Sequence, residues 1–153
     1  MTKPGSNAPA FTLDSEDGPL SLKDFAGRKL VLYFYPKDDT SGCTREAIDF
    51  TGLLPEFEKA DTAVLGVSKD TVAKHGKFRT KHGLGVKLGS DPDAKVIDAY
   101  GVWVEKTLYG RKYMGIERAT FLIGRDGKIA EAWHNVKVPG HAEAVLKAAQ
   151  ALG

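Results

Sequence analysis

The sequence predicts an α/β protein in which a mixed central sheet is flanked by helices. Short, densely apolar segments alternate with longer amphipathic ones, and turns rich in Gly, Pro and Asp separate them. An Asp-Gly pair, Asp126-Gly127, joins the last two strands as a hairpin, so the sheet must contain antiparallel neighbours. The length of 153 residues predicts a single domain over residues 1–153 that can bury a real core.

The first half of the chain contains four segments that favour an extended backbone. They are Phe11–Leu13, Leu20–Leu22, Lys29–Tyr35 and Thr62–Val67. The first two are short and lie on either side of a turn. The last two are apolar enough to be buried strands, and Lys29–Tyr35 is expected to be covered on both faces. A helix is expected from Cys43 onward, and Pro55 should kink or break it.

The second half supplies the remaining elements of the sheet and its helices. We expect helices at Val72–His82, from Asp91 to about Tyr100 and at Pro139–Leu152, and strands at Lys87–Ser90, Ala119–Ile123 and Lys128–Trp133. Gly83 is placed to end the first of these helices. The resulting order, β-α-β-α-β-α-β-β-α, is that of a thioredoxin-like domain with N-terminal additions, with helices on both faces of the sheet.

Composition and charge exclude several classes of function. A formal net charge of +2, without a stripe of Lys and Arg, gives no reason to expect a nucleic-acid partner. No apolar run approaches the roughly 18 residues of a membrane span, so we expect no membrane partner. Residues 1–7 contain no apolar stretch typical of a secretory leader, and the cytoplasm is the expected location. A single cysteine excludes a disulfide within the chain.

That one cysteine, Cys43, lies where the strand Lys29–Tyr35 should pass into a helix. Backbone N–H groups and the helix dipole at a helix N-terminus favour the thiolate over the thiol. The preceding Thr40, Ser41 and Gly42 are turn and cap residues that leave such N–H groups unpaired. The alternative is a buried thiol that serves only as a small hydrophobic side chain. The polar neighbours of Cys43 favour the nucleophile.

The surroundings of Cys43 resemble the active site of peroxiredoxins. Pro36, Thr40 and Cys43 match the motif Pro-x-x-x-Thr-x-x-Cys, and Glu46 follows three residues later. The wider run from Tyr33 to Thr44 is similar to the bacterioferritin-comigratory, or Q-type, branch, and the similarity extends from residue 4 to about 146. This resemblance implies a thioredoxin fold and a thiol-dependent peroxidase that needs no cofactor and no metal.

The resemblance also implies a role for each residue of the motif. The Cys43 thiolate would attack the terminal oxygen of hydrogen peroxide or an organic hydroperoxide and become a sulfenic acid. Thr40 would hydrogen-bond the peroxide, and Pro36 would shield the sulfur from water. Arg118, in the segment Arg118–Ile123 that resembles the second active-site segment of the family, would stabilise the thiolate and orient the peroxide. Glu46 would hold an arginine in place.

Two questions about charge remain open at the level of the sequence. Asp38 and Asp39 would oppose a thiolate by like-charge repulsion unless their side chains point away from it. A cation is therefore needed, and Arg45 competes with Arg118 for that role. Residues i and i+2 of a helix do not face each other, which makes Arg45 the weaker candidate.

The chain departs from the Q-type pattern in ways that affect the reaction. Many members carry a second cysteine five residues after the first, and here that position is Ile48. The sulfenic acid must then be resolved by an external thiol: glutathione with glutaredoxin, a thioredoxin or a second chain. We expect a monomer, with a dimer as the alternative. Ser41 also replaces a common proline, which leaves the turn less rigid.

Other features give weaker signals. The four histidines, His75, His82, His134 and His141, show no metal-ligand spacing with Cys43. The basic surface of Val72–His82 is either a solvated helix face or a docking surface for an acidic reductant. A thiol–disulfide oxidoreductase is disfavoured because no Cys-x-x-Cys is present. A non-enzymatic peroxide sensor remains the alternative function, and turnover with an added thiol separates it from an enzyme.

Overall fold

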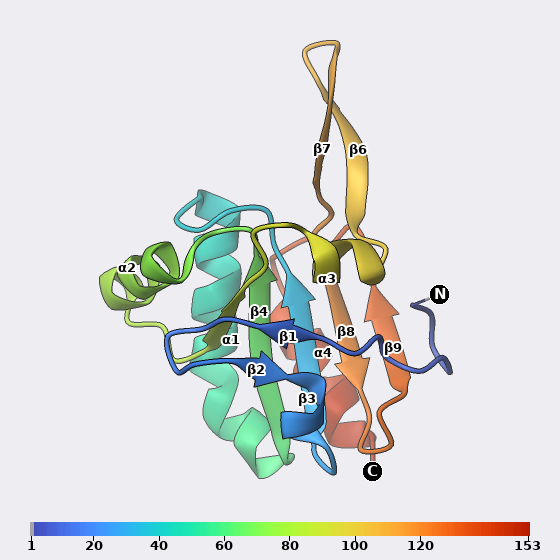
Figure 1. Ribbon diagram of the computed structural model, residues 1–153. Helices are drawn as coiled ribbons and strands as arrows, with labels where there is room; N and C mark the ends of the chain where they lie inside the picture. The colour runs from blue at the N-terminus through green and yellow to red at the C-terminus, as the bar shows by residue number, and fades with distance from the viewer. Residues whose placement is uncertain (1) are drawn as a thin grey trace.

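A computed structural model describes residues 2–153 and shows a five-stranded mixed sheet at the centre of the protein (Figure 1). In the order in which they lie across the sheet, its strands are β5 (Lys87–Ser90), β4 (Thr62–Ser68), β3 (Lys29–Phe34), β8 (Ala119–Ile123) and β9 (Ile129–Trp133). β3, β4 and β5 are parallel, whereas β8 is antiparallel to β3 and β9 is antiparallel to β8. The predicted fold class is confirmed.

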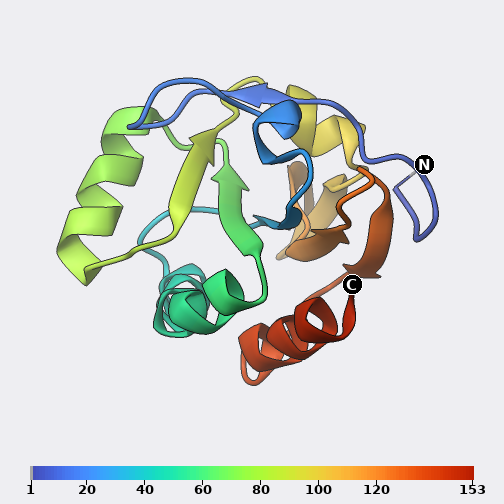
Figure 2. The same ribbon diagram turned by 90° about the horizontal axis from the view of Figure 1, so that it is seen from below.

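Helices and short N-terminal elements cover the two faces of this sheet (Figure 2). On one face lie α1 (Ser41–Lys59) and α4 (His141–Ala151), which pack against each other, and α2 (Val72–His82) packs beside β5. The opposite face is covered by α3 (Lys95–Ala99), by the antiparallel pair β1 (Thr12–Leu13) and β2 (Leu20–Ser21), and by the 3-10 turn η1 (Leu22–Phe25). No helix among the described residues combines the length and apolarity needed to cross a membrane.

The central strand β3 divides the core into two layers. Every residue of β3 is buried, as its apolar sequence predicts. Leu32 and Phe34 pack into the layer under the N-terminal elements and α3, whereas Val31 and Tyr33 pack into the layer under α1 and α4. The alternation follows from the two-residue period of a strand.

The helix α1 does not break at Pro55, which was one of the two outcomes expected from the sequence, but continues through this residue. A proline inside a helix removes one backbone hydrogen bond, here the one that residue 55 would donate to the carbonyl of Thr51. Pro55 is exposed, and the turns on either side of it bury Phe50 and Phe57 completely. Burial of these two rings offsets the lost bond, so the helix continues to Lys59.

A second departure concerns α3, which begins at Lys95 rather than at Asp91. Asp91 instead accepts a hydrogen bond from the backbone N–H of Ile97 at 2.8 Å. Ala94, in the left-handed region with φ of 58°, separates the Asp-Pro-Asp turn from the helix. The polar turn therefore caps the helix and does not form part of it.

A two-stranded hairpin that the sequence analysis left unassigned rises from the sheet (Figure 1). It consists of β6 (Trp103–Leu108) and β7 (Arg111–Ile116), which are antiparallel. The two linking residues, Tyr109 and Gly110, both have positive φ, as a type I′ turn requires. A tyrosine rarely adopts this conformation, so Tyr-Gly is a weaker turn signal than Asn-Gly or Asp-Gly.

The closing helix α4 is tied to the sheet by a buried histidine. The Nε2 atom of His141 lies 2.8 Å from the Thr120 hydroxyl, and its ring meets Phe50 and Trp133 edge-on. Burial, followed by the positive charge of Arg118, lowers the pKa of His141 from 6.5 to about 4. His141 is therefore a neutral member of the core at pH 7.

Replacing Pro55 with Ala should stabilise the protein, because alanine restores the N–H donor and has a far better helix propensity. We expect the free energy of unfolding, measured by urea denaturation, to rise by about 1–3 kcal/mol. Gly52→Ala is the matched control, since a Cβ at Gly52 meets nothing within 4 Å. Gly52→Ala should raise the free energy of unfolding by about 1 kcal/mol, from helix propensity alone. A Pro55→Ala variant less stable than the wild type would contradict this account.

His141 should make the fold sensitive to acid. Between pH 6.5 and about pH 4 the unfolded chain binds a proton at His141 that the folded protein does not, so stability falls as the pH is lowered through this range. The test measures the free energy of unfolding at pH 7 and at pH 4.5 in the wild type and in His141→Gln, which keeps a partner for Thr120 but cannot titrate. We expect the loss between the two pH values to be about 2 kcal/mol larger in the wild type. Equal losses in the two proteins would exclude this role.

Candidate active site

The loop after β3 delivers Cys43 to the start of α1. Thr40 is the N-cap residue of α1, and Cys43 is the third residue of the helix. The backbone N–H of Thr44 donates to the carbonyl of Thr40 at 2.8 Å and opens the intrahelical series. The N–H groups of residues 41–43 precede that series, so they are oriented as donors at the positive end of the helix dipole. Cys43 lies where the sequence predicts it.

The Cys43 sulfur is buried against Arg118. Cys43 is only 2% exposed, and its Sγ accepts a hydrogen bond from Nη2 of Arg118 at 3.3 Å. Arg118 immediately precedes β8, whose first residue, Ala119, pairs with Phe34 at the end of β3. The antiparallel register thus carries the guanidinium from a segment 75 residues away to the start of α1.

Glu46 holds the other side of the same guanidinium. Its Oε1 accepts from Nη1 of Arg118 at 2.7 Å, and Glu46 is 1% exposed. Burial raises the pKa of Glu46 to about 7, and the opposing effect of Arg118 does not offset it. Desolvation acts to lower the pKa of Arg118, but the charges of Glu46 and Cys43 outweigh it and raise this pKa above its ordinary value. Arg118 therefore stays charged between two groups that it can stabilise.

Gly42 leaves room for this arrangement. A Cβ at position 42 would lie 3.1 Å from Nη2 of Arg118, tighter than ordinary contact, so a side chain there would displace the arginine. The competing cation, Arg45, pairs with Asp49 at 3.1 Å and its side chain is 73% exposed. Of the two arginines, only Arg118 is hydrogen-bonded to the sulfur.

Thr40 and Pro36 lie on the exposed part of the loop. The Thr40 hydroxyl donates its single hydrogen to the carbonyl of Lys37 at 2.8 Å. Its lone pairs can therefore accept from a peroxide, but in this arrangement it has no hydrogen to give to the sulfur. The side chain makes no helix-capping hydrogen bond, although Thr40 occupies the N-cap position.

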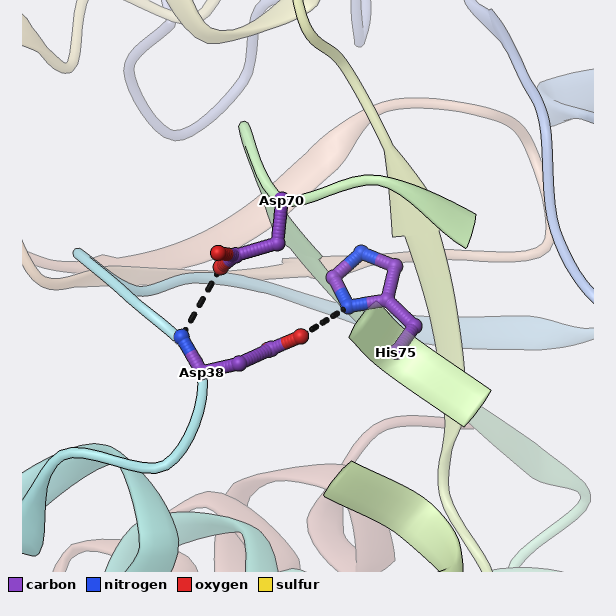
Figure 3. A group of neighbouring side chains, drawn as sticks. All are labelled: Asp38, Asp70 and His75. Carbon is purple, nitrogen blue, oxygen red and sulfur yellow. Dashed lines mark hydrogen bonds and ion pairs between the residues drawn. The ribbon is translucent and has the colours of Figure 1, made fainter. Parts of the chain in front are cut away.

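The two acidic residues of the loop point toward α2. The carboxylate of Asp38 accepts from the Tyr35 hydroxyl at 2.5 Å and lies 2.6 Å from Nδ1 of His75, while the N–H of Asp38 donates to Asp70 at 2.8 Å (Figure 3). Nε2 of His75 lies 3.1 Å from the carbonyl of Gly89, so both ring nitrogens have a hydrogen-bond partner.

This network explains why the acidic loop does not oppose a thiolate. The carboxylate of Asp38 is hydrogen-bonded within the buried network around His75, and Asp39 lies 2.8 Å from both the ammonium group of Lys81 and Nε2 of His82. The sequence analysis did not identify His75 as a partner of the loop. The sequence does place His75 three residues before Phe78, on the side of α2 that is buried. The contact of this side with Asp38, however, exists only in the tertiary structure.

Asp38, Asp70 and His75 also bring three possible metal-ligand atoms within 4.8 Å of one another. These atoms are already engaged. Asp70 accepts from the Ser68 hydroxyl at 2.7 Å as well as from the N–H of Asp38, and both oxygens of Asp38 have partners. The group forms a hydrogen-bond network that attaches the loop to α2.

The β6–β7 hairpin contributes a wall to the site. A cavity of about 360 Å³ is lined by Arg118 together with residues of β6 and of the loop after β9. Lys106 of β6 lies close enough that burial and then the charge of Arg118 lower its pKa. Lys106 was not expected near the site, because the sequence contains no clear signal for the β6–β7 hairpin that carries it.

Comparison with known proteins agrees with this geometry. Residues 4–132 match the AhpC/TSA family. The chain is 50% identical over 143 residues to a putative peroxiredoxin Bcp of Coxiella burnetii, which covers 93% of this chain and 95% of that protein. It is 47% identical over 156 residues to peroxiredoxin Bcp of Xanthomonas campestris, covering 99% and 98%.

Solved structures give the same result. A structure of the X. campestris bacterioferritin comigratory protein, studied for alkyl peroxide reduction, superposes with a TM-score of 0.88 at 47% identity, covering 92% of this chain and 90% of that one. A cysteine-to-serine variant of Xylella fastidiosa PrxQ gives 0.89 at 46% identity, covering 99% and 94%. With a buried thiol held by an arginine on a thioredoxin-like fold, the chain belongs to the peroxiredoxin family, in its Bcp or Q branch, and is a thiol-dependent peroxidase.

Proposed function

We propose that Cys43 is the peroxide-reducing thiol and that the enzyme works with this one cysteine, relying on an external thiol. The observation that carries the assignment is the 3.3 Å hydrogen bond from Arg118 to the only sulfur nucleophile of the chain, at the first turn of α1. Helix N–H groups and a guanidinium both favour a negatively charged sulfur.

In the first step the Cys43 thiolate attacks the terminal oxygen of the peroxide. A sulfur–oxygen bond forms, the oxygen–oxygen bond breaks, and the leaving oxygen takes a proton to become water or an alcohol. Arg118 stabilises the negative charge that moves onto the leaving oxygen, and Thr40 accepts a hydrogen bond from the peroxide. Glu46 holds the guanidinium in place and does not touch the reacting atoms.

In the second step an external thiol attacks the sulfenic sulfur. Water leaves and a mixed disulfide forms; a second thiol then attacks the partner's sulfur and releases Cys43 as a thiol. The chain offers no sulfur for an internal route, since Ile48 stands where many relatives carry the second cysteine. Ile48 is 43% exposed, so nothing in its packing demands an isoleucine.

The substrates we propose are hydrogen peroxide and small organic hydroperoxides. The cavity of about 360 Å³ between β6, Arg118 and the loop after β9 lies beside the guanidinium that would orient the peroxide, and it offers room for a substituent on the peroxide. The X. campestris relative is described as reducing alkyl peroxides. Both observations favour organic hydroperoxides as well as hydrogen peroxide.

Replacing the proposed groups should affect sulfenic-acid formation selectively. Cys43→Ser should abolish peroxide reduction. Arg118→Ala and Thr40→Val should each slow oxidation of Cys43 by about 100- to 1,000-fold, the usual loss when one transition-state stabiliser is removed. The rate is measured by stopped-flow mixing of the reduced enzyme with peroxide, and circular dichroism verifies the fold of each variant.

Arg45→Ala is the matched control, because Arg45 lies two residues after Cys43 but pairs with Asp49. It should leave the oxidation rate within about twofold of the wild type, as an exposed ion pair contributes little. If Arg45→Ala collapsed the rate while Arg118→Ala preserved it, the cation would be wrongly assigned.

The fate of the oxidised sulfur tests the one-cysteine mechanism. Peroxide without reductant should add one oxygen to the intact mass, and excess peroxide should add a second, because no internal thiol traps the sulfenic acid. An added thiol should divert it to a mixed disulfide. Burial of Cys43 to 2% exposure opposes contact between two Cys43 sulfurs. Rapid, stoichiometric disulfide dimers at low protein concentration would therefore replace this mechanism with an intermolecular one.

A further inference from the structure

The surface beside the active-site loop has an uneven charge. The helix α2 carries four Lys and Arg residues and no acidic residue, so the +2 balance of the whole chain depends on this one helix. Lys74, Lys77 and Lys81 are spaced i, i+3 and i+7, which places them on one side of α2. Lys37 of the active-site loop joins them around a hollow of about 230 Å³. We call these four residues the lysine face.

Most lysines of this face have no ion-pair partner among the described residues. Among residues 2–153, no carboxylate forms an ion pair with Lys37, Lys74 or Lys77, whereas Lys81 binds Asp39 at 2.8 Å. Asp38 and Asp70 also line the hollow, but they accept hydrogen bonds within the network around His75 and make no ion pair with these lysines, so four ammonium groups face three carboxylates there. The lysine face therefore presents three free ammonium groups to solvent.

The lysine face adjoins the loop that leads to the nucleophile. Lys37 lies six residues before Cys43, and Asp39 four residues before it. The loop is held to this face by Asp39, through exposed pairs with Lys81 and His82. Exposed pairs of this kind contribute at most about 1 kcal/mol each, so carboxylates from a partner can replace Asp39 at little cost. A partner bound here would touch the loop that leads to a sulfur only 2% exposed.

We propose that the lysine face is the docking surface for the reductant, and that the reductant is a dithiol protein with an acidic rim around its reactive thiol. The inference rests on the proposed need for an external thiol. A dithiol protein balances the reaction alone: its first thiol displaces water from the sulfenic acid, and its second releases Cys43 while the partner becomes a disulfide. Complementary charge accelerates the encounter of the two proteins.

The test compares reductants in a double charge-reversal variant, Lys74→Glu with Lys77→Glu. The probes are an acidic bacterial thioredoxin, recycled by its reductase and NADPH, and dithiothreitol, which carries no charge. The control is Lys147→Glu, an exposed lysine of α4 that forms no ion pair among the described residues. The proposed reacting atoms are not contacted by any of the three substituted lysines, Lys74, Lys77 and Lys147.

At low ionic strength the double variant should lose about tenfold or more of the second-order rate constant with thioredoxin, and the loss should shrink as salt is added. Turnover with dithiothreitol and oxidation by peroxide should stay within about twofold of the wild type, as should every rate of Lys147→Glu.

Three results would overturn the docking proposal while the peroxidase stands. They are an unchanged thioredoxin rate in the double variant, an equal loss with dithiothreitol, and a wild type that dithiothreitol reduces but thioredoxin does not. Failure of the wild type to turn over with any thiol would instead reject the proposed function.

Discussion

The antiparallel pairing of β3 with β8 is the constraint on which the active site depends. Phe34 pairs with Ala119, so the residue before β8, Arg118, reaches the point where β3 ends and the chain turns toward α1. The same turn presents the first helical N–H groups and the Cys43 sulfur. A shift of one residue in this register would turn the buried side chains of β8 to the opposite face. Because both faces of the central strands are buried, the core enforces the register, and the register places the arginine.

Charge in this protein is separated across the active-site loop. On one side, the guanidinium of Arg118 lies between the Cys43 sulfur and a buried Glu46. On the other side, the acidic residues of the loop are turned toward the basic helix α2, where Asp38 meets His75 and Asp39 meets Lys81. The loop thus turns its acidic side chains toward α2, and the same side chains attach the loop to that helix. Removal of either set of partners would alter the electrostatic environment of the sulfur.

The single sulfur of the chain is well placed for small oxidants and poorly placed for large reductants. Peroxide is small, and Arg118, which is hydrogen-bonded to the sulfur, also lines a cavity together with β6 and the loop after β9. A protein thiol must approach a sulfur that is 2% exposed, and with Ile48 in place of a second cysteine no internal thiol can act first. The proposed mechanism therefore places different demands on its two half-reactions, because a small peroxide can reach a buried sulfur more easily than the proposed external thiol can. This requirement makes the charged surface of α2 relevant to turnover.

Much of the fold and of the site followed from local sequence. The bounds of α2, β5 and β8 agree with those predicted, because short apolar strands and a helix ended by Gly83 are local patterns. Cys43 at the start of α1 was identified from its turn and cap neighbours, and Arg118, the residue before β8, from the resemblance of its segment to the second active-site segment of peroxiredoxins. Other features depended on contacts between distant segments. The helix α1 passes Pro55 because Phe50 and Phe57 are buried on either side of it, and the β6–β7 hairpin turns at Tyr109, where local propensity gives little signal. The pairing of Asp38 with His75 joins residues 37 positions apart.

The sequence by itself determined which residues could react, because the reactivity of a thiol and the charge of a guanidinium belong to the side chains themselves. Only the tertiary structure decided which charges meet, because packing of the sheet and helices sets the distances between them.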